Sequence, residues 1–283
     1  MKKILKKIFK FIKDLFDFLD FLLLLIYHRL FSNPIKEKYS GEVSVLANGP
    51  SLKEVIPKLS TEAFQHSDFV VMNFFAFEEV FYEIKPKYYC LADPMFIEDT
   101  PKKDQVMLLF KILQEKVDWE LNIYLPNKGF YKNFLKYSSL SNSYLKYICL
   151  SGVEYKGFEK YRNFFYKKGL STPKIQTVAN MAIYVALNMG YSPIMLYGVE
   201  HTFLNSLCVN DKNQLCMKEV HFYDQNVVEL KPMAENWQMA VYLRSISNMF
   251  ASHDLLEQYA RYLGVKIINC TKGSMIDSYE RIK

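Results

Sequence analysis

Residues 43–52 read VSVLANGPSL, and this segment sets the fold class of the chain. Its first five residues form a short apolar run that favours a buried strand. Asn48 and Gly49 follow as a tight turn, and Ser51 with Glu54 three residues later has the form of a capping box. The segment therefore predicts the first strand and the first helix of an α/β fold.

The rest of the chain alternates strand-like and helix-like segments. Apolar runs predict further strands at residues 69–73, 88–92, 121–125, 147–150, 194–197 and 265–269. Helices are expected from 177 to 189, where Gly190 ends the helix, and from about 233 to 263 with a break near 252–254. Strands separated by helices imply a mostly parallel sheet with helices on both faces. A single Rossmann-like α/β domain is thus expected over residues 43–283.

The composition is that of an ordinary globular chain, with 50% hydrophobic and 23% charged residues, which excludes a disordered or collagen-like protein. The five cysteines are scattered and none is spaced as CxxC, which favours reduced thiols over a metal site. The sequence contains no DxD, HExxH or GxSxG motif. We therefore expect neither a bound metal nor a cofactor.

The positive charge of the chain comes from its first 13 residues. Lys and Arg total 36 and Asp and Glu total 30, for a net charge of +6. Residues 1–13 hold six lysines and no acid, which leaves 30 basic against 30 acidic residues in the remainder. A nucleic-acid-binding domain would carry its positive charge on the folded surface, so nucleic acid is excluded as a partner.

Residues 1–31 predict an amphipathic basic helix, because apolar residues recur there at three- and four-residue spacings with lysines between them. The longest uncharged run, 21–27, is far shorter than the ~20 residues that span a bilayer. We expect the helix to lie on an anionic inner-leaflet surface, where each Lys contributes about 1 kcal/mol. The alternative is a helix that docks on its own domain or on a partner. Residues 32–42 are expected to form a linker.

The candidate site consists of polar residues that follow the expected strands, because ligands bind beyond the carboxyl ends of parallel strands. These residues are Asn48, Gly49, Asn73, Asp93, Gly198, Glu200, His201, Asn269, Thr271 and Ser274. Gly49 would let the backbone approach a phosphate, and free amides around Pro50 and Ser51 would attract it, so a Cβ at Gly49 is expected to fill ligand space. The alternative is that Gly49 serves only the turn and Ser51 only the cap.

Three histidines are candidates for proton transfer, because the pKa of His lies near neutral pH. His201 directly follows a buried strand. His221, with Tyr223 beside it, lies in the 204–232 segment, which is expected to form a lid-like loop over bound ligand. His253 is expected at a helix cap. For each histidine a purely structural role is the alternative, and His221 is the preferred catalytic residue.

The order of these motifs resembles that of bacterial sialyltransferases of glycosyltransferase family 42. It also resembles the related domains of motility-associated flagellin glycosylation factors and of archaeal hydroxymethylpterin pyrophosphokinases. The segments that carry the resemblance are ANGPSL at 47–52, Asn73, Thr177 thirteen residues ahead of Gly190, and the strand that runs into Gly198-Val199-Glu200. The resemblance covers roughly residues 43–203 and, more loosely, 265–276. It implies a GT-A-variant Rossmann-like fold.

Carried over by position, the resemblance implies a nucleotide-sugar site. Asn48 and Gly49 would hold the nucleotide, and Asn73 would touch the donor phosphate or sugar. Glu200 would stand where the family has an acid near the cytidine ribose, and the loop of Gly273 and Ser274 would meet the base.

The sequence departs from the family pattern at three places. The family's Thr-Ser-Gly is here Thr177-Val178-Ala179, with Asn180 placed to compensate, and its Asn-Pro-Ser is here Asp93-Pro94-Met95. No histidine aligns with the family's catalytic one, although His221 lies in the corresponding loop region.

Together these features predict a metal-independent glycosyltransferase that moves a sialic-acid-like or Kdo-like sugar from a CMP-activated donor onto a bacterial surface glycan, as in lipopolysaccharide or capsule biosynthesis. The expected partners are the nucleotide-sugar donor, a glycan acceptor such as a lipid-linked one, the inner-leaflet surface and a further copy of the chain. The expected location is the cytoplasmic face of the inner membrane, as a peripheral protein. One alternative is a pterin-type pyrophosphokinase that uses ATP and Mg²⁺ at Asp93 and Glu200. Another is a non-catalytic membrane-tethered scaffold.

Overall fold

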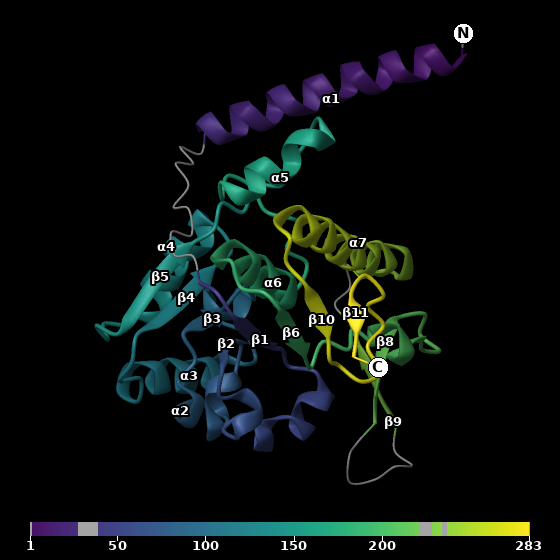
Figure 1. Ribbon diagram of the computed structural model, residues 1–283. Coiled ribbons are helices and arrows are strands. Elements are labelled where there is room, and N and C mark those ends of the chain that lie inside the picture. The colour runs from purple at the N-terminus through teal and green to yellow at the C-terminus, as the bar shows by residue number, and fades with distance from the viewer. Residues whose placement is uncertain (1, 28–38, 221–227, 234–236, 283) are drawn as a thin grey trace.

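A computed structural model describes residues 2–27, 39–220, 228–233 and 237–282 (Figure 1). Its centre is an eight-stranded sheet in the order β11-β10-β6-β1-β2-β3-β4-β5, and every neighbouring pair is parallel. The strands are β1 Glu42–Leu46, β2 Ser67–Met72, β3 Tyr88–Cys90, β4 Leu121–Leu125, β5 Leu145–Cys149, β6 Ile194–Tyr197, β10 Ile267–Asn269 and β11 Glu280–Arg281. The expected Rossmann-like α/β fold is confirmed.

The strand order reverses next to β1. From β1 the chain places β2 to β5 one after another on one side, and then returns so that β6 pairs with the other edge of β1. In open α/β sheets such a reversal leaves a crevice at the carboxyl ends of the two diverging strands. The ends of β1 and β6 are therefore where a ligand site belongs.

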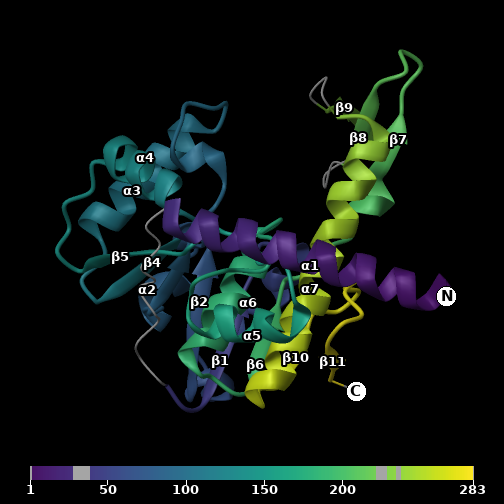
Figure 2. The same ribbon diagram turned by 90° about the horizontal axis from the view of Figure 1, so that it is seen from above.

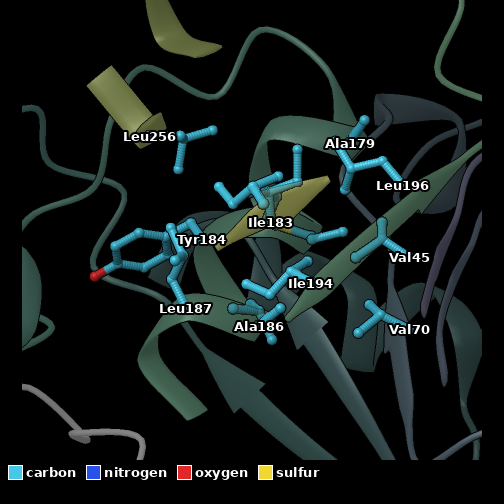
Figure 3. Close-up of a cluster of buried hydrophobic side chains, with 14 of the residues drawn as sticks. Val45, Val70, Ala179, Ile183, Tyr184, Ala186, Leu187, Ile194, Leu196 and Leu256 are labelled. Atoms are coloured by element: carbon cyan, nitrogen blue, oxygen red, sulfur yellow. The ribbon is translucent and has the colours of Figure 1, made fainter. Parts of the chain in front are cut away.

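Helices cover both faces of the sheet. They are α2 Val80–Ile84, α3 Lys103–Glu115, α4 Lys128–Ser138, α5 Glu159–Lys167, α6 Val178–Met189 and α7 Met239–Leu263. Alternate strand residues belong to the two cores: Val45 and Val70 pack with α6 and α7, whereas Leu46 and Val71 pack with α3 and α4. Figure 3 shows the first of these cores, in which α6 contributes Ile183 and its neighbours.

The helix expected after Gly49 is instead a series of short 3₁₀ turns. These are η1 Pro50–Glu54, η2 Ile56–Lys58 and η3 Glu62–Phe64, with η4 Phe75–Phe77 and η5 Pro94–Phe96 further on. Ser51 makes no capping bond; its backbone N–H donates to Glu200 Oε1 at 2.7 Å. Pro57 has no N–H, so an α-helix that began at Pro50 would lose a bond there. The predicted capping box at Ser51 was therefore wrong.

Helix α7 is continuous, and the break expected at 252–254 is absent from it. The hydroxyl of Ser252 donates to the carbonyl of Asn248 one turn earlier at 3.0 Å, and to that of Lys174 at 2.6 Å. His253 is fully buried in the middle of the helix rather than at a cap. These polar residues face the protein interior, which is why they do not interrupt the helix.

The segment that was expected to be a lid-like loop contains a small antiparallel sheet in its described part. After η6 Phe203–Ser206 come β7 Leu207–Val209, β8 Leu215–Val220 and β9 Val228–Pro232, in the order β7-β8-β9. Leu215 packs against Tyr242, Ile246 and Met249 of α7. The small sheet stands beside the first turns of α7, away from the main sheet (Figure 2).

Helix α1, Lys2–Tyr27, lies across α5 in both views (Figures 1 and 2). Phe21 is fully buried between Tyr155 and Phe165, with ring centroids 4.9 Å from each. The chain therefore does dock this helix on its own body. Among the described helices, none combines the length and apolar character that crossing a bilayer requires.

Candidate active site

A cleft of about 910 Å³ opens at the carboxyl edge of the sheet, where the strand order reverses. The loops that follow β1, β2, β3, β4 and β6 all contribute to its wall. The cleft therefore lies where the fold predicts a ligand site, and its lining comes from segments that are far apart in the sequence.

Most of the residues singled out from the sequence line this cleft. They are Asn48, Gly49, Pro50, Asn73, Asp93, Thr177, Gly198, Glu200 and His201. Ser51 and Asn180 lie next to lining residues, and Gly273 and Ser274 are not among the lining residues. His221 and Tyr223 lie outside the described residues.

Glu200 joins the two central loops of the cleft. It is buried, its Oε1 accepts the Ser51 backbone N–H, and its backbone oxygen accepts the N–H of Met275 at 2.8 Å. Its second carboxylate oxygen, Oε2, is buried without a hydrogen-bond partner among the described residues. Because an unpaired buried carboxylate oxygen is costly, it is a strong acceptor for a ligand donor.

Gly49 is a glycine because protein atoms, not a ligand, occupy the space beside it. An added Cβ would lie 1.5 Å from Glu200 Oε2 and 2.5 Å from the carbonyl oxygen of Gly198. The Gly49 N–H donates to that same carbonyl at 2.8 Å, which ties the end of β1 to the end of β6. The expectation that a Cβ here would fill ligand space was therefore wrong: the space is filled by Glu200.

Asn73 ends β2 in the left-handed region, with φ of 52°, a conformation that Asn tolerates better than most residues. Its backbone oxygen accepts a hydrogen bond from the Tyr89 hydroxyl. Its side-chain oxygen, Oδ1, is buried with no partner in the described part of the chain. Asn73 thus lines the cleft and carries a second buried acceptor without a partner among the described residues.

The N-terminus of α6 forms one wall of the cleft. Thr177 and Asn180 make a reciprocal capping box: the Thr177 hydroxyl accepts the Asn180 N–H, and Asn180 Oδ1 accepts the Thr177 N–H at 3.2 Å. Val178 and Ala179, whose amides have no acceptor within the helix, line the cleft. The Asn180 side-chain NH₂ is buried without a partner among the described residues. This wall therefore supplies donors, as an anionic group requires.

The charged side chains of the cleft are mainly acidic. Asp93, Glu154 and Glu200 line it, against Lys174 as the one lysine or arginine among the described lining residues. Asp93 caps η5, with Oδ1 accepting the Met95 N–H at 3.0 Å. In the described ranges no group of three or more His, Cys, Asp or Glu side chains is placed to hold a metal ion. Protein donors that could bind an anion are thus concentrated at α6. The acidic remainder of the cleft favours ligand groups that donate hydrogen bonds, such as hydroxyls or amines.

Ser274 supports the cleft from behind. Its hydroxyl donates to the carbonyl of Val199 at 2.7 Å and accepts from Asn269 at 3.0 Å and from the Ile276 N–H at 3.2 Å. Thr271 accepts the Val199 N–H in the same way, at 3.0 Å. The loop after β10 therefore fixes the backbone that carries Glu200 and His201.

His201 begins a buried chain of hydrogen bonds. Its Nε2 lies 2.9 Å from Nε2 of His253, and Nδ1 of His253 lies 2.8 Å from the hydroxyl of Tyr279. Burial lowers the pKa of His201 to about 4. Burial, with the nearby His201, lowers the pKa of His253 to about 3, and burial raises the pKa of Tyr279. At neutral pH all three side chains are therefore uncharged.

This neutral chain sets the tautomer of His201. In the described part of the protein, the Tyr279 hydroxyl has no other hydrogen-bond partner. We assign its proton to Nδ1 of His253, because the buried hydroxyl proton would otherwise be unpaired. His253 then carries its own proton on Nε2 and donates it to Nε2 of His201. His201, which lines the cleft, is left with a proton on Nδ1. We infer that it is a neutral hydrogen-bond donor.

The buried histidines predict a loss of stability in acid. In the unfolded chain a His titrates near pH 6.5, whereas the pKa of His201 is about 4 and that of His253 about 3 in the folded protein. The unfolded state therefore binds more protons below pH 6.5, and the free energy of unfolding should fall as the pH drops from about 6.5 towards 4. Urea unfolding between pH 7.5 and 4.5 measures this slope. The double variant His201→Asn/His253→Gln should flatten it; an unchanged slope would assign the acid sensitivity to other groups.

Several lining residues were missed from the sequence. Asn127 follows β4 and caps α4, and the same rule of polar residues after strands would have identified it. The loop 172–176 precedes a helix rather than following a strand, so that rule does not reach it. Phe203 stacks beside His201, with ring centroids 5.7 Å apart. This ring contact depends on the conformation of the loop after β6, which the sequence does not indicate.

The chain matches no protein-family model and none of the curated proteins. Among solved structures it is similar to the MAf glycosyltransferase from Magnetospirillum magneticum AMB-1, at 14% sequence identity and a TM-score of 0.42. The match covers 88% of this chain and 34% of that one, so the chain spans about a third of that protein's length. A similarity this distant bears on neither activity nor substrate.

Proposed function

We propose that the cleft binds a nucleotide-activated sugar and that the protein is a glycosyltransferase. The observation that carries the proposal is the composition of the cleft at the strand reversal. Free amides of α6 stand on one wall. Asn73 and Glu200 line others, and each has a buried side-chain oxygen, Oδ1 and Oε2, without a partner among the described residues. The amides suit a phosphate or carboxylate, and the acceptors suit sugar and ribose hydroxyls. The resemblance of the ANGPSL and GVE segments to family 42 favours a CMP-activated, sialic-acid-like or Kdo-like donor.

The proposed reaction breaks the bond between the anomeric carbon and the phosphate oxygen of the donor. The bond's electron pair leaves with the nucleotide phosphate, whose added charge His201 Nδ1–H and the α6 amides stabilise. The acceptor hydroxyl oxygen forms the new bond to the anomeric carbon, and its proton passes to a base. We propose His221, the preferred catalytic residue of the sequence analysis, as this base.

A thermal-shift screen against CMP, CDP, UDP, GDP and ATP, each with Mg²⁺ or with EDTA, tests ligand binding. CMP should stabilise the protein in EDTA as well as in Mg²⁺, by about 2.7 kcal/mol at 100 times its Kd. Asn73→Gly keeps the positive φ and removes the side chain, so it should weaken this shift. Asn213→Gly is the matched control, because Asn213 has φ of 58° in an exposed turn outside the cleft. Equal loss in both variants would mean that the effect comes from introducing Gly at such a position and not from the Asn73 side chain.

The acidic lining favours one second candidate, a pyrophosphokinase that takes ATP with Mg²⁺. Three carboxylates against one lysine would suit a nucleotide that arrives with its metal ion. Stabilisation by ATP that disappears in EDTA would favour this activity over glycosyl transfer. No stabilisation by any nucleotide would favour the scaffold instead.

A further inference from the structure

Helix α1 carries an apolar face that the described body of the protein does not cover. Leu5, Phe9, Ile12, Phe16, Leu19, Leu23 and Ile26 are all exposed large apolar residues, and we call them the outer face of α1. They recur at alternating four- and three-residue steps, so they form one continuous row along the helix. Phe9 is 72% exposed and Phe16 67% exposed. Side chains of this size stay exposed in such number only where another surface covers them.

Docking on the body uses a different side of the same helix. Phe18 contacts Phe158, Tyr161 and Phe165 with ring centroids 5.8–6.1 Å away, and Phe21 is fully buried. The backbone of Phe18 approaches so closely that a Cβ on Gly157, which has φ of 110°, would lie 2.8 Å from its Cα. The helix is therefore held firmly on α5 while its outer face stays open.

The charge on α1 indicates what covers the outer face. All six lysines of residues 1–13 lie in the first turns of the helix, and in the described ranges only Lys13 forms an ion pair, with Asp17 at 3.4 Å. These turns extend beyond α5, and the N-terminus points away from the body (Figures 1 and 2). A second copy of α1 placed along the row would bring lysines towards lysines in a parallel pair. A surface of negative charge above an apolar layer matches both features at once.

We propose that the outer face of α1 binds an anionic lipid surface, with the lysine-rich turns at the headgroups. The docked side of α1 then fixes how the body sits on that surface. Helix α5 lies in the segment between Glu154 and Thr172. These two residues form an isolated β-bridge with each other, and both line the cleft. The membrane-bound helix is thus attached to the rim of the cleft. This arrangement suits an acceptor that is itself anchored in the bilayer.

Co-sedimentation of the full chain with vesicles tests the proposal. Binding to vesicles of phosphatidylglycerol and phosphatidylcholine should be strong and salt-sensitive, and binding to phosphatidylcholine alone should be weak. Phe9→Ser/Phe16→Ser should weaken binding by more than about tenfold, because each buried Phe contributes on the order of tenfold. Replacing the six lysines by Gln should weaken it and remove the salt dependence. The control is Leu108→Ser/Tyr144→Ser, which removes exposed apolar side chains elsewhere and should leave binding unchanged.

Two outcomes would overturn the proposal. In one, the outer-face variant binds anionic vesicles as well as the wild type does. In the other, the wild type does not bind vesicles but forms a dimer, and Phe9→Ser/Phe16→Ser dissociates that dimer. The outer face of α1 would then bind a second copy of the chain. Circular dichroism and the unfolding midpoint of each variant verify that the body is intact. None of these readouts involves the cleft, so they stand or fall separately from glycosyl transfer.

Discussion

Gly49→Val should destabilise the fold as well as the cleft, by about 3 kcal/mol or more, which is the upper part of the range for overpacking. The new Cβ would meet Glu200 Oε2 at 1.5 Å and the Gly198 carbonyl at 2.5 Å. If the backbone at position 49 moved away from these atoms, the hydrogen bond from its N–H to the Gly198 carbonyl would break. The Glu200 carboxylate would also lose the Ser51 N–H. Urea unfolding monitored by circular dichroism measures the loss.

Two further variants separate the causes. Gly129→Ala is the control, because its nearest contact is Asn127 Oδ1 at 3.3 Å and it lies in the first turn of α4, so it should change stability by less than about 1 kcal/mol. Gly49→Ala/Glu200→Ala removes the clash with the carboxylate but keeps the one with the carbonyl, so it should recover stability only in part. If Gly49→Val folds like the wild type and loses only nucleotide binding, the space beside Gly49 belongs to the ligand after all.

The sequence was enough to predict most of the residues that line the cleft, but not the contacts that they make. Polar residues after apolar runs identified Asn73, Asp93 and Glu200, because strand ends depend on a local pattern. The role of Gly49 depends on Glu200, 151 residues later, and no local pattern encodes that contact. The same limit explains the error at Ser51: its form is that of a cap, but a distant carboxylate accepts its N–H.

The histidines show this limit most clearly. The sequence predicts His253 at a helix cap, yet it lies mid-helix and links His201 to Tyr279. His201, His253 and Tyr279 come from a loop, a helix and the C-terminal segment. No regular spacing in the sequence relates them, so their contact could not be predicted from it. The N-terminal helix was predicted in part. Its sequence pattern predicts an amphipathic helix and leaves open whether the helix docks on its own domain. Only the structure shows that docking on α5 leaves the outer face of α1 exposed.

Tyr279→Phe should change the protonation of His201 in the cleft, although Tyr279 is not among the described lining residues. The substitution removes the hydroxyl that lies 2.8 Å from His253 Nδ1, which we assign as its donor, and leaves the ring in place. His253 is then free to carry its proton on either nitrogen, so His201 no longer holds its own proton only on Nδ1. Losing one neutral hydrogen bond costs about 0.5–1.5 kcal/mol, which predicts up to roughly a tenfold fall in turnover.

His201→Asn should cost more, about 10²–10³-fold in turnover, because it removes the donor itself. Asn is chosen because position 201 has φ of 52°, which Asn adopts with little strain. Nitrogen NMR of the ring in the ligand-free protein reads the tautomer directly, independently of any reaction. It should show His201 protonated on Nδ1 in the wild type and a mixture in Tyr279→Phe. A wild-type His201 protonated on Nε2 would reverse every donor in the chain and make its free nitrogen an acceptor, so that His201 would serve as the base for the acceptor hydroxyl rather than as the donor to the phosphate.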